Sequence, residues 1–297
     1  MKQHKNMKNH KPHFLSFLRL AEFVSRVMPK KLIDAIYRCS FLSHCIRRLL
    51  NFYAPSGLTE VSFKSGVLRG LRLKLDLKSE KSYWLGTYET KVIQAIHDFV
   101  KPGMIVYDIG ADIGYISLVF SQAVGKQGRV YAFEPLPDNV KRIRTHIALN
   151  SLQEIVTVLP YAVSDSTGRK PFLVHELHAM GKLSGSSGRN TTYSEQIEVN
   201  TLCLDDFVFK DGNPAPDLFK IDIEGGGVTA IPGMSNIIKN IHPIILMELH
   251  GPEEAQITWD LLRQCNYKIY RMKKDYPEIP TSDSLDWKEY IVATSYK

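Results

Sequence analysis

Short apolar runs alternate with segments of helical periodicity over residues 104–265. The runs are almost continuously apolar, which is typical of strands that are covered on both faces of a parallel sheet. The pattern predicts strands at 104–109, 129–134, 155–159, 218–223 and 243–249, and helices at 115–124, 138–150 and 228–240, with a last helix that ends near Cys265. This alternation predicts a doubly wound α/β domain with a mostly parallel sheet.

Three stretches depart from the alternation. Residues 60–77 alternate apolar and polar side chains, with turns at Gly66 and Gly70, which predicts a β-hairpin. Residues 82–103 predict a loop and then a helix that stops at a Pro-Gly pair. A polar insert at 165–200 predicts short strands around a Gly/Ser-rich loop.

The N-terminal segment, residues 1–58, carries the positive charge of the chain. The net charge is +7, yet residues 1–50 hold eleven Lys or Arg against Glu22 and Asp34, which is +9 and leaves about −2 for the rest. A nucleic-acid-binding domain typically carries its positive charge on its folded face, so we predict no nucleic-acid partner. The first dozen residues are expected to be disordered, and the following residues predict an amphipathic helix that ends near Pro29 and then a second helix.

Two interpretations of the N-terminal helices stay open. They attach to the anionic surface of a membrane, or they dock on the main domain or on a partner chain. No apolar run reaches the roughly 18 residues that a membrane-spanning helix needs. The four cysteines form no CxxC pair, which indicates reduced thiols. We therefore expect a cytoplasmic protein, free or attached to the cytoplasmic face of a membrane, with its main domain over 59–297 and a hairpin lead-in over 59–79.

The loop after the first strand of the alternation, "DIGADIG", constrains the ligand. It lacks the GxxxxGK[ST] pattern that binds the phosphates of nucleoside triphosphates, and Asp112 stands where a dinucleotide-binding GxGxxG loop has its second glycine. Gly110 and Gly114 still allow a sharp turn and a close approach of the backbone to a ligand. The loop is therefore a poor site for a pyrophosphate, which the Asp112 carboxylate would repel.

Two acids at strand ends define the complementary ligand. Asp108 lies at the carboxyl end of its strand, where ligands bind in this architecture, and favours a positively charged group. Glu134 ends the next strand, twenty residues past Gly114, and can accept hydrogen bonds from the hydroxyls of a ribose. A ribose, a positive charge and no phosphate together indicate S-adenosylmethionine.

Four segments in this order resemble the FkbM-type S-adenosylmethionine-dependent methyltransferases, and the resemblance covers roughly residues 80–250. The segments are "VYDIGADIGYISL", "VYAFEPLPDNVKRIRTHIALN", "LPYAVSDSTG" and "DLFKIDIEG", with "YWLGTYE" upstream as a similar lead-in. The resemblance implies a class I, Rossmann-like methyltransferase fold with a seven-stranded sheet. It also implies O-methylation, commonly of sugars, glycolipids or polyketide hydroxyls.

The resemblance also implies roles for individual residues. The methionine part of the cofactor would be held by Asp108, Gly110, Ala111 and Gly114, the ribose by Glu134 with Pro135 shaping the turn, and the adenine by Ala162, Val163 and Ser164. Asn150 would cap a helix end. For Tyr88 and Glu89 two roles stay open: they close over the cofactor, or they only begin a helix. The family often has an acid where this chain has Gly227, which makes the contacts of that position a question for the structure.

Catalytic candidates follow two adjacent strands, which end in "DIE" and "MELH". We predict Asp222 as the base or as the group that orients the acceptor, with His250 second and with Glu224 facing the transferred methyl group. Simpler roles stay open: Asp222 binding the cofactor's amino group or a backbone amide, and His250 capping the next helix. Lys220 is expected to be solvated or paired with an acid, and Glu248 to be a second base candidate or a buried ion-pair partner. The carboxylates would also suit magnesium, but we predict no metal.

These observations lead to competing functions. The first is an O-methyltransferase that acts on a carbohydrate, a glycolipid or a related metabolite, with the insert at 165–200 helping to shape the acceptor pocket. The alternative is a catalytically degenerate domain that serves as a binding module, attached to a membrane or partner by its basic N-terminus. A nicotinamide-dependent oxidoreductase is a weaker third, because Asp112 argues against it.

Overall fold

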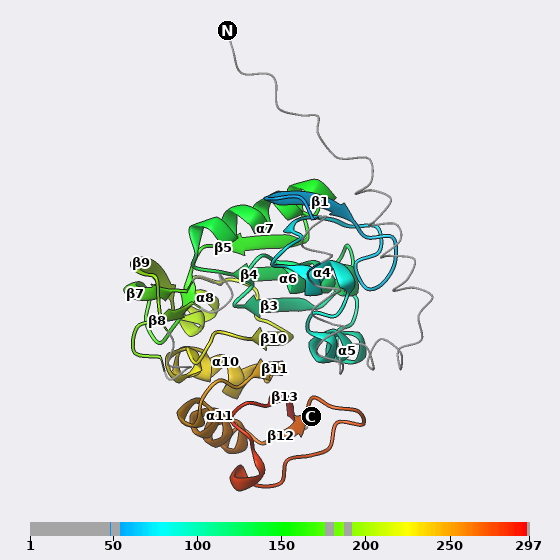
Figure 1. Cartoon of the computed structure of the whole chain (residues 1–297). Coiled ribbons are helices and arrows are strands. Elements are labelled where there is room, and N and C mark those ends of the chain that lie inside the picture. The colour runs from blue at the N-terminus through cyan, green and yellow to red at the C-terminus, as the bar shows by residue number, and fades with distance from the viewer. Residues whose placement is uncertain (1–47, 49–53, 176–180, 187–191, 296–297) are drawn as a thin grey trace. The chain divides into compact units, whose positions relative to one another are not determined.

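A computed structural model of the chain describes residue 48 and residues 54–175, 181–186 and 192–295 (Figure 1). Apart from residue 48, the segment 1–53 lies outside the described residues, so the N-terminal helices and the boundary at 58 and 59 stay predictions. The chain divides into two compact units that meet at Tyr88 and Glu89, and each is described by itself. None of the helices in the described ranges has the length and apolar character needed to cross a bilayer.

The first unit contains a two-stranded antiparallel sheet. Strand β1 (Leu58–Ser62) pairs with β2 (Arg72–Asp76), as the alternation of side chains predicts. Gly66 and Gly70 adopt left-handed backbone angles between the two strands, with φ of 74° and 91°. Helix α4 (Lys81–Leu85) follows and ends at the left-handed Gly86, a common way to close a helix.

The second unit is built on a seven-stranded sheet with the order β12-β13-β11-β10-β3-β4-β5. The strands are β3 (Ile105–Ile109), β4 (Arg129–Phe133), β5 (Val156–Leu159), β10 (Leu218–Ile221), β11 (Ile244–Glu248), β12 (Tyr267–Arg271) and β13 (Tyr290–Ser295). Six of them run in the same direction, and β13 runs antiparallel to its neighbours β11 and β12. The prediction of a mostly parallel seven-stranded sheet is confirmed.

Helices precede the first strand of the sheet and lie between the later strands. They are α5 (Thr90–Phe99), α6 (Tyr115–Val124), α7 (Pro137–Asn150), α8 (Leu204–Phe209), α9 (Gly227–Ala230), η2 (Pro232–Met234), α10 (Ser235–Asn240), α11 (Pro252–Gln264) and the short η3 (Ser282–Ser284). In Figure 1, α8, α10 and α11 lie on one side of the sheet and α5 lies on the other. The prediction that Asn150 closes its helix fits the structure, because its Nδ2 donates to the His146 carbonyl at 2.7 Å.

The insert after β5 forms a second, four-stranded sheet with the order β6-β9-β7-β8. Its strands are β6 (Ala162–Val163), β7 (Gly168–Val174), β8 (Lys182–Leu183) and β9 (Glu195–Leu202). Strands β7 and β9 pair antiparallel along their length. Short strands were expected in this polar insert, and the Gly/Ser-rich loop predicted within it falls partly outside the described residues.

Two predicted elements differ from the structure. The helix expected over 228–240 is divided into α9, η2 and α10, because Pro232 has no N–H to donate to the preceding turn. The strand expected over 218–223 ends at Ile221, and the chain then turns through Glu224 (φ 46°) and Gly225 (φ 82°) in left-handed conformations. Asp222 therefore stands just beyond the strand, in the turn.

Candidate active site

The loop between β3 and α6 lies against the end of β10. Gly110 and Gly114 have positive φ, 80° and 83°. A Cβ on Gly110 would lie 1.9 Å from the carbonyl oxygen of Asp222, so no larger residue fits there. The N–H groups of Gly110 and Ala111 donate to the carbonyl of Phe133 at 3.1 and 3.0 Å. The close approach that the sequence predicts for Gly110 is thus made, in this structure, to the protein's own backbone.

Asp108 and Lys220 form a buried ion pair on neighbouring strands. Asp108 is fully buried; its Oδ2 accepts from Ser117 Oγ at 2.5 Å, and its Oδ1 accepts no hydrogen bond from the residues that the structure describes. Lys220 Nζ lies 3.5 Å from Asp108 Oδ1 and 3.5 Å from Asp222 Oδ2, and it donates to the Gly110 carbonyl at 2.9 Å. Burial raises the pKa of Asp108, and Lys220 partly offsets this rise. Burial alone would lower the pKa of Lys220, but Asp222 and Asp108 hold it above its usual value.

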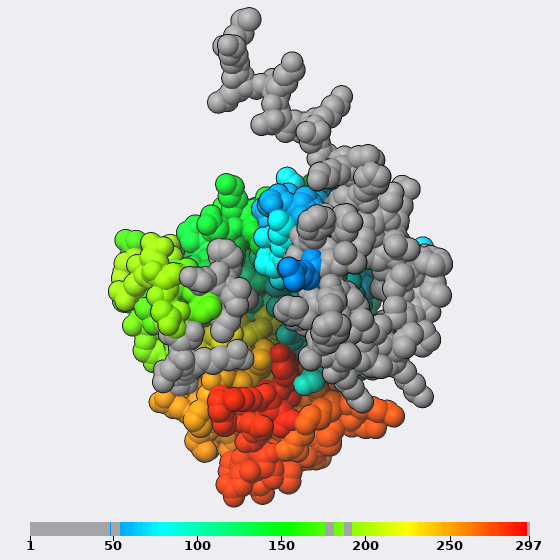
Figure 2. Space-filling model, viewed as in Figure 1, coloured from blue at the N-terminus to red at the C-terminus, as the bar shows by residue number. Residues whose placement is uncertain are grey.

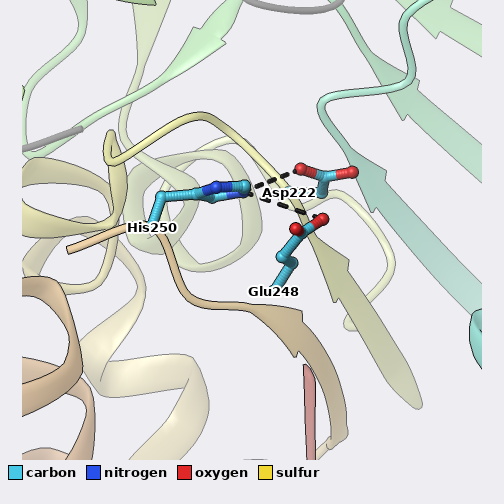
Figure 3. Close-up of side chains that lie close together, drawn as sticks. All are labelled: Asp222, Glu248 and His250. Atoms are coloured by element: carbon cyan, nitrogen blue, oxygen red, sulfur yellow. Dashed lines mark hydrogen bonds and ion pairs between the residues drawn. The ribbon is translucent and has the colours of Figure 1, made fainter. Parts of the chain in front are cut away.

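Asp222 and His250 form the contact at the centre of the site, drawn in Figure 3. His250 Nε2 lies 3.0 Å from Asp222 Oδ1 and 3.9 Å from Glu248 Oε2, and its Nδ1 lies 3.7 Å from Glu224 Oε2. Burial lowers the pKa of His250, but the hydrogen bond and charge of Asp222 outweigh it and raise the pKa to about 9. Burial opposes ionisation of Asp222, yet Lys220 and His250 hold its pKa well below the usual range. With these two shifts the pair is a carboxylate and an imidazolium at neutral pH.

Two further acids and a tyrosine adjoin this pair. Glu89 has a left-handed backbone (φ 45°), and its Oε1 accepts from Tyr290 Oη at 3.2 Å. Burial, and next the charge of Asp222, raise the pKa of Glu89 and bring the pKa of Glu248 to about 7. A small cavity of about 10 Å³, with room for roughly one water molecule, is lined by Val92, Lys220, Ile221, Asp222, Leu246, Met247, Glu248 and Tyr290.

Glu134 stands directly after β4, on the far side of β3 from β10. Its Oε2 accepts from the Asp112 N–H at 2.9 Å, and its Oε1 accepts from the Leu136 N–H at 2.9 Å and from Asn139 Nδ2 at 3.4 Å. A carboxylate has about four acceptor positions, so about one remains for a ligand. Burial, and then the Asp112 charge, raise the pKa of Glu134 to about 8.

The residues predicted to border the adenine lie on the short strand β6. Val163 is buried in the main hydrophobic core, which also contains Phe133. Ala162 is buried in a smaller cluster with Leu136 and Phe172. The assignment of these two residues, and of the half-buried Pro135, to the cofactor remains a prediction.

The structure brings the predicted catalytic residues together. Asp222, Glu224, Glu248 and His250 meet at the ends of two adjacent strands, and Glu89 joins them through Tyr290. Sequence reasoning missed Tyr290, because it lies on β13, which reaches the site only through antiparallel pairing with β11. The sequence left Lys220 either solvated or paired with an acid, and in the structure it is paired with Asp108 and Asp222.

One group of the site has the donor types of a metal centre. One ligand atom each from Asp222, Glu248 and His250 lie within 4.8 Å of one another. Oxygen and imidazole ligands of this kind suit several divalent cations. However, the charge of Asp222 is already met by the Lys220 ammonium at 3.5 Å and by His250 at 3.0 Å. These contacts account for the group without an ion, and the absence of a metal remains a prediction.

The charges of the site fit a cationic ligand that carries a ribose. Five carboxylates, those of Glu89, Asp108, Asp222, Glu224 and Glu248, are opposed by two basic groups, Lys220 and His250. The buried Oδ1 of Asp108 lies 3.5 Å from the Lys220 ammonium and accepts no closer hydrogen bond within the described ranges, and Glu134 keeps about one acceptor position for a hydroxyl. An excess of carboxylates, of which Asp108 is buried and the other four are half-buried, favours positive charge and disfavours phosphate.

Comparison with known proteins agrees with this chemistry. The chain is 25% identical over 191 residues to the hexuronic acid methyltransferase AglP of Haloferax volcanii, which covers 63% of this chain and 74% of that protein. It is 27% identical over 120 residues to a ribosomal protein L11 methyltransferase of Thermoanaerobacter pseudethanolicus, covering 40% of this chain and 38% of the relative.

Solved structures of methyltransferases superpose on part of the chain. The methyltransferase FkbM of Methylobacillus flagellatus matches with a TM-score of 0.42 and 16% identity, over 73% of this chain and 53% of that one. The SAM-dependent O-methyltransferase TM0748 of Thermotoga maritima matches with a TM-score of 0.41 and 15% identity, over 70% of this chain and 65% of that one.

A family model described as the methyltransferase FkbM domain matches residues 108–269, which is more than half of the chain. The match contains both acids at the strand ends, the loop between β3 and α6, and the Asp222–His250 pair. This family match argues against the third function considered from the sequence, that of a nicotinamide-dependent oxidoreductase. The chain belongs to the FkbM methyltransferase family, has the class I methyltransferase fold, and is an S-adenosylmethionine-dependent methyltransferase.

Proposed function

We propose that the protein methylates a hydroxyl group of a carbohydrate, a glycolipid or a related metabolite. The observation that carries this proposal is the Asp222–His250 contact of 3.0 Å at the carboxyl end of the sheet. Such a pair can take the proton that an alcohol must lose when its oxygen is methylated. A relative named for hexuronic acid methylation supports a sugar as the acceptor.

The residues that would hold S-adenosylmethionine divide into two groups. Asp108, Gly110, Ala111 and Gly114 would face its methionine part, with Glu89 beside them, and the ribose and adenine would lie toward Glu134, Pro135, Ala162 and Val163. The excess of carboxylates supports the first assignment, and the remaining acceptor position of Glu134 supports the second. When bound, the cofactor supplies a methyl group on a positively charged sulfur, which an acceptor oxygen displaces in line.

The Asp222–His250 pair would manage the acceptor's proton. The imidazolium of His250 cannot accept a proton, and Asp222 is a weak base because its pKa is depressed. The pair becomes an effective base only when His250 loses its proton. A positive charge that enters the site lowers the pKa of His250 and so favours this neutral form. Glu224, 3.7 Å from His250 Nδ1, would hold the ring in place.

Radiolabelled methyl transfer to a panel of uronic acids, neutral sugars and glycolipids tests the proposal. We expect transfer to at least one sugar hydroxyl, with losses of about 10²-fold or more in kcat for Asp222→Ala and His250→Ala. His97→Ala is the matched control, because the His97 side chain is exposed and contacts the carboxylate of the neighbouring Asp98, away from the Asp222–His250 pair. Calorimetry that detects no S-adenosylmethionine binding to the intact protein would overturn the proposal.

A non-catalytic binding module remains the second candidate. The mutual pairing of Asp108 with Lys220, and of Asp222 with His250, supports it, because each acid has a partner without any ligand. This candidate predicts cofactor binding without turnover on every acceptor tested. Transfer to any acceptor at a rate above that of Asp222→Ala would exclude it.

The basic segment 1–58 is proposed to attach the protein to an anionic membrane surface or to dock on protein. Its +9 charge over residues 1–50 supports the first role. Flotation of the full chain with vesicles that contain or lack anionic lipid separates the two. Binding that requires anionic lipid supports membrane attachment, and its absence supports docking.

A further inference from the structure

Glu254 joins the two segments that carry the catalytic candidates. It is the third residue of α11 and is fully buried. Its Oε2 accepts from the backbone N–H of His250 at 2.6 Å, and its Oε1 accepts from the backbone N–H of Gly227 at 2.8 Å. Burial raises the pKa of the Glu254 carboxyl group, and the two backbone N–H donors oppose this rise because they favour the ionised form.

The bond to His250 alone would be a local feature of the helix start, where a glutamate at this position often accepts from a backbone N–H just before the helix. The bond to Gly227 is different, because it crosses 27 residues of sequence to the segment after β10. One carboxylate thus connects the turn that follows Asp222 with the residue whose side chain contacts Asp222.

Gly227 is shaped to receive this carboxylate. A Cβ at Gly227 would lie 2.3 Å from Glu254 Oε1 and 2.9 Å from its Cδ. Gly227 does not have a positive φ, so the backbone conformation does not demand glycine here. The position lacks a side chain because Glu254 fills the space, and the two residues form a complementary pair.

We infer that Glu254 is a positioning residue, which sets the Asp222–His250 contact by clamping Gly227 and His250 to one carboxylate. The clamp closes a ring: from Glu254 to His250, through the imidazole to Asp222, along the turn to Gly227 and back to Glu254. A ring of this kind leaves little freedom for the distance between Nε2 and Oδ1. The inference rests on the proposed function for its catalytic consequence, but the geometry that it describes exists without turnover.

The test uses the full-length protein and the variants Glu254→Gln and Glu254→Ala. Glutamine keeps the shape, but its NH₂ group would face one of the two N–H donors, so one bond is lost. Glu253→Gln is the matched control, because Glu253 is the preceding residue of the same helix and is exposed.

The first readout is the pKa of His250, followed by NMR of its imidazole. We expect it to fall by about one unit or more in both Glu254 variants, since a looser contact with Asp222 no longer stabilises the imidazolium. The Glu253 control keeps the wild-type value. With an acceptor in hand, kcat should fall by about 10- to 100-fold while the acceptor KM stays within about twofold, because alignment is lost rather than binding.

The second readout is a double-mutant cycle. Gly227→Ala places a methyl group against Glu254 and should also lower the pKa of His250. In the Glu254→Ala background the carboxylate is gone, so Gly227→Ala should add almost nothing. Unchanged His250 titration in Glu254→Gln, or fully additive effects in the cycle, overturns the inference. The His250 titration and the double-mutant cycle need no acceptor, so they test the positioning role of Glu254 even if the protein transfers no methyl group. A lack of methyl transfer would refute only the proposed function.

Discussion

The variant Lys220→Met tests whether the buried lysine neutralises the acids of the site. Lys220 is nearly inaccessible, with 6% of its side chain exposed, and it lies 3.5 Å from both Asp108 and Asp222. Methionine has a similar unbranched length but no charge. The substitution therefore keeps the packing and leaves Asp108 fully buried without its cation.

The expected loss follows from these distances. At an effective dielectric constant of about 20, each pair at 3.5 Å contributes roughly 5 kcal/mol of attraction. The cost of burying the ammonium offsets much of this sum, and breaking a buried pair from one side typically costs about 3–5 kcal/mol. We expect a loss in this range, which is a large fraction of the roughly 5–15 kcal/mol that holds a domain folded.

Urea unfolding at pH 7.5 measures the effect. For a slope of about 2.5 kcal/mol per molar, the midpoint should fall by roughly 1–2 M. Lys210→Met is the control, because the Lys210–Asp206 ion pair is exposed and its loss should leave the midpoint unchanged.

The pH dependence gives an independent sign. The pKa of Asp108 is already raised by burial, and losing Lys220 raises it further. A carboxyl group with a raised folded-state pKa weakens the fold as pH rises from its unfolded value through the folded one. The loss of unfolding free energy in Lys220→Met, relative to the wild type, should therefore become smaller as the pH falls. A loss below about 1 kcal/mol at pH 7.5, or a loss that becomes larger toward acid pH, would refute the reasoning.

Three further predictions concern titration and metals. Asp222→Asn should lower the pKa of His250 from about 9 by at least roughly one unit, by NMR, since Asp222 is the main group that raises it; an unchanged value contradicts this. The affinity for S-adenosylmethionine, measured by calorimetry, should rise by up to about tenfold per pH unit as the pH increases toward 8 and should then level off, because ribose hydroxyls prefer the ionised Glu134. The affinity of Glu134→Gln should not change with pH. A wild-type affinity that does not change with pH counts against the assignment of Glu134 to the ribose. Treatment with EDTA should leave methyl transfer within about twofold, because Lys220 and His250 already meet the Asp222 charge; restoration by magnesium of a lost activity would contradict this.

The strands and the neighbours at their ends were predictable because they depend on local pattern and on simple topology. The apolar run at 129–134 became β4 (Arg129–Phe133), and parallel strands bring their carboxyl ends to one edge. Asp222 and His250 therefore emerged as neighbours from two strand-end motifs. The single helix expected over 228–240 was wrong, because Pro232 breaks a periodicity that otherwise continues.

The contacts that organise the site were not predictable in the same way. Lys220 lies in an otherwise apolar strand, and its burial depends on acids that arrive from the strand beside it and from the turn. Tyr290 reaches Glu89 across 201 residues of sequence, and Glu254 reaches Gly227 across 27. Such long-range contacts leave no periodic pattern in the sequence. Gly227 was noticed in the sequence because it replaces an acid, and its glycine is explained by Glu254, which occupies the space of a Cβ.

The charge balance links cofactor binding to the appearance of the base. Lys220 and the imidazolium of His250 neutralise Asp108 and Asp222, while burial, and next the charge of Asp222, hold the pKa of Glu248 near 7. A cation that binds among these acids neutralises part of their charge and repels the imidazolium, so the pKa of His250 falls. Lys220 cannot make this exchange, since its own pKa lies above the usual range. In the mechanism proposed above, His250 and not Lys220 therefore releases the proton, so that the Asp222–His250 pair becomes basic when the cationic cofactor is bound.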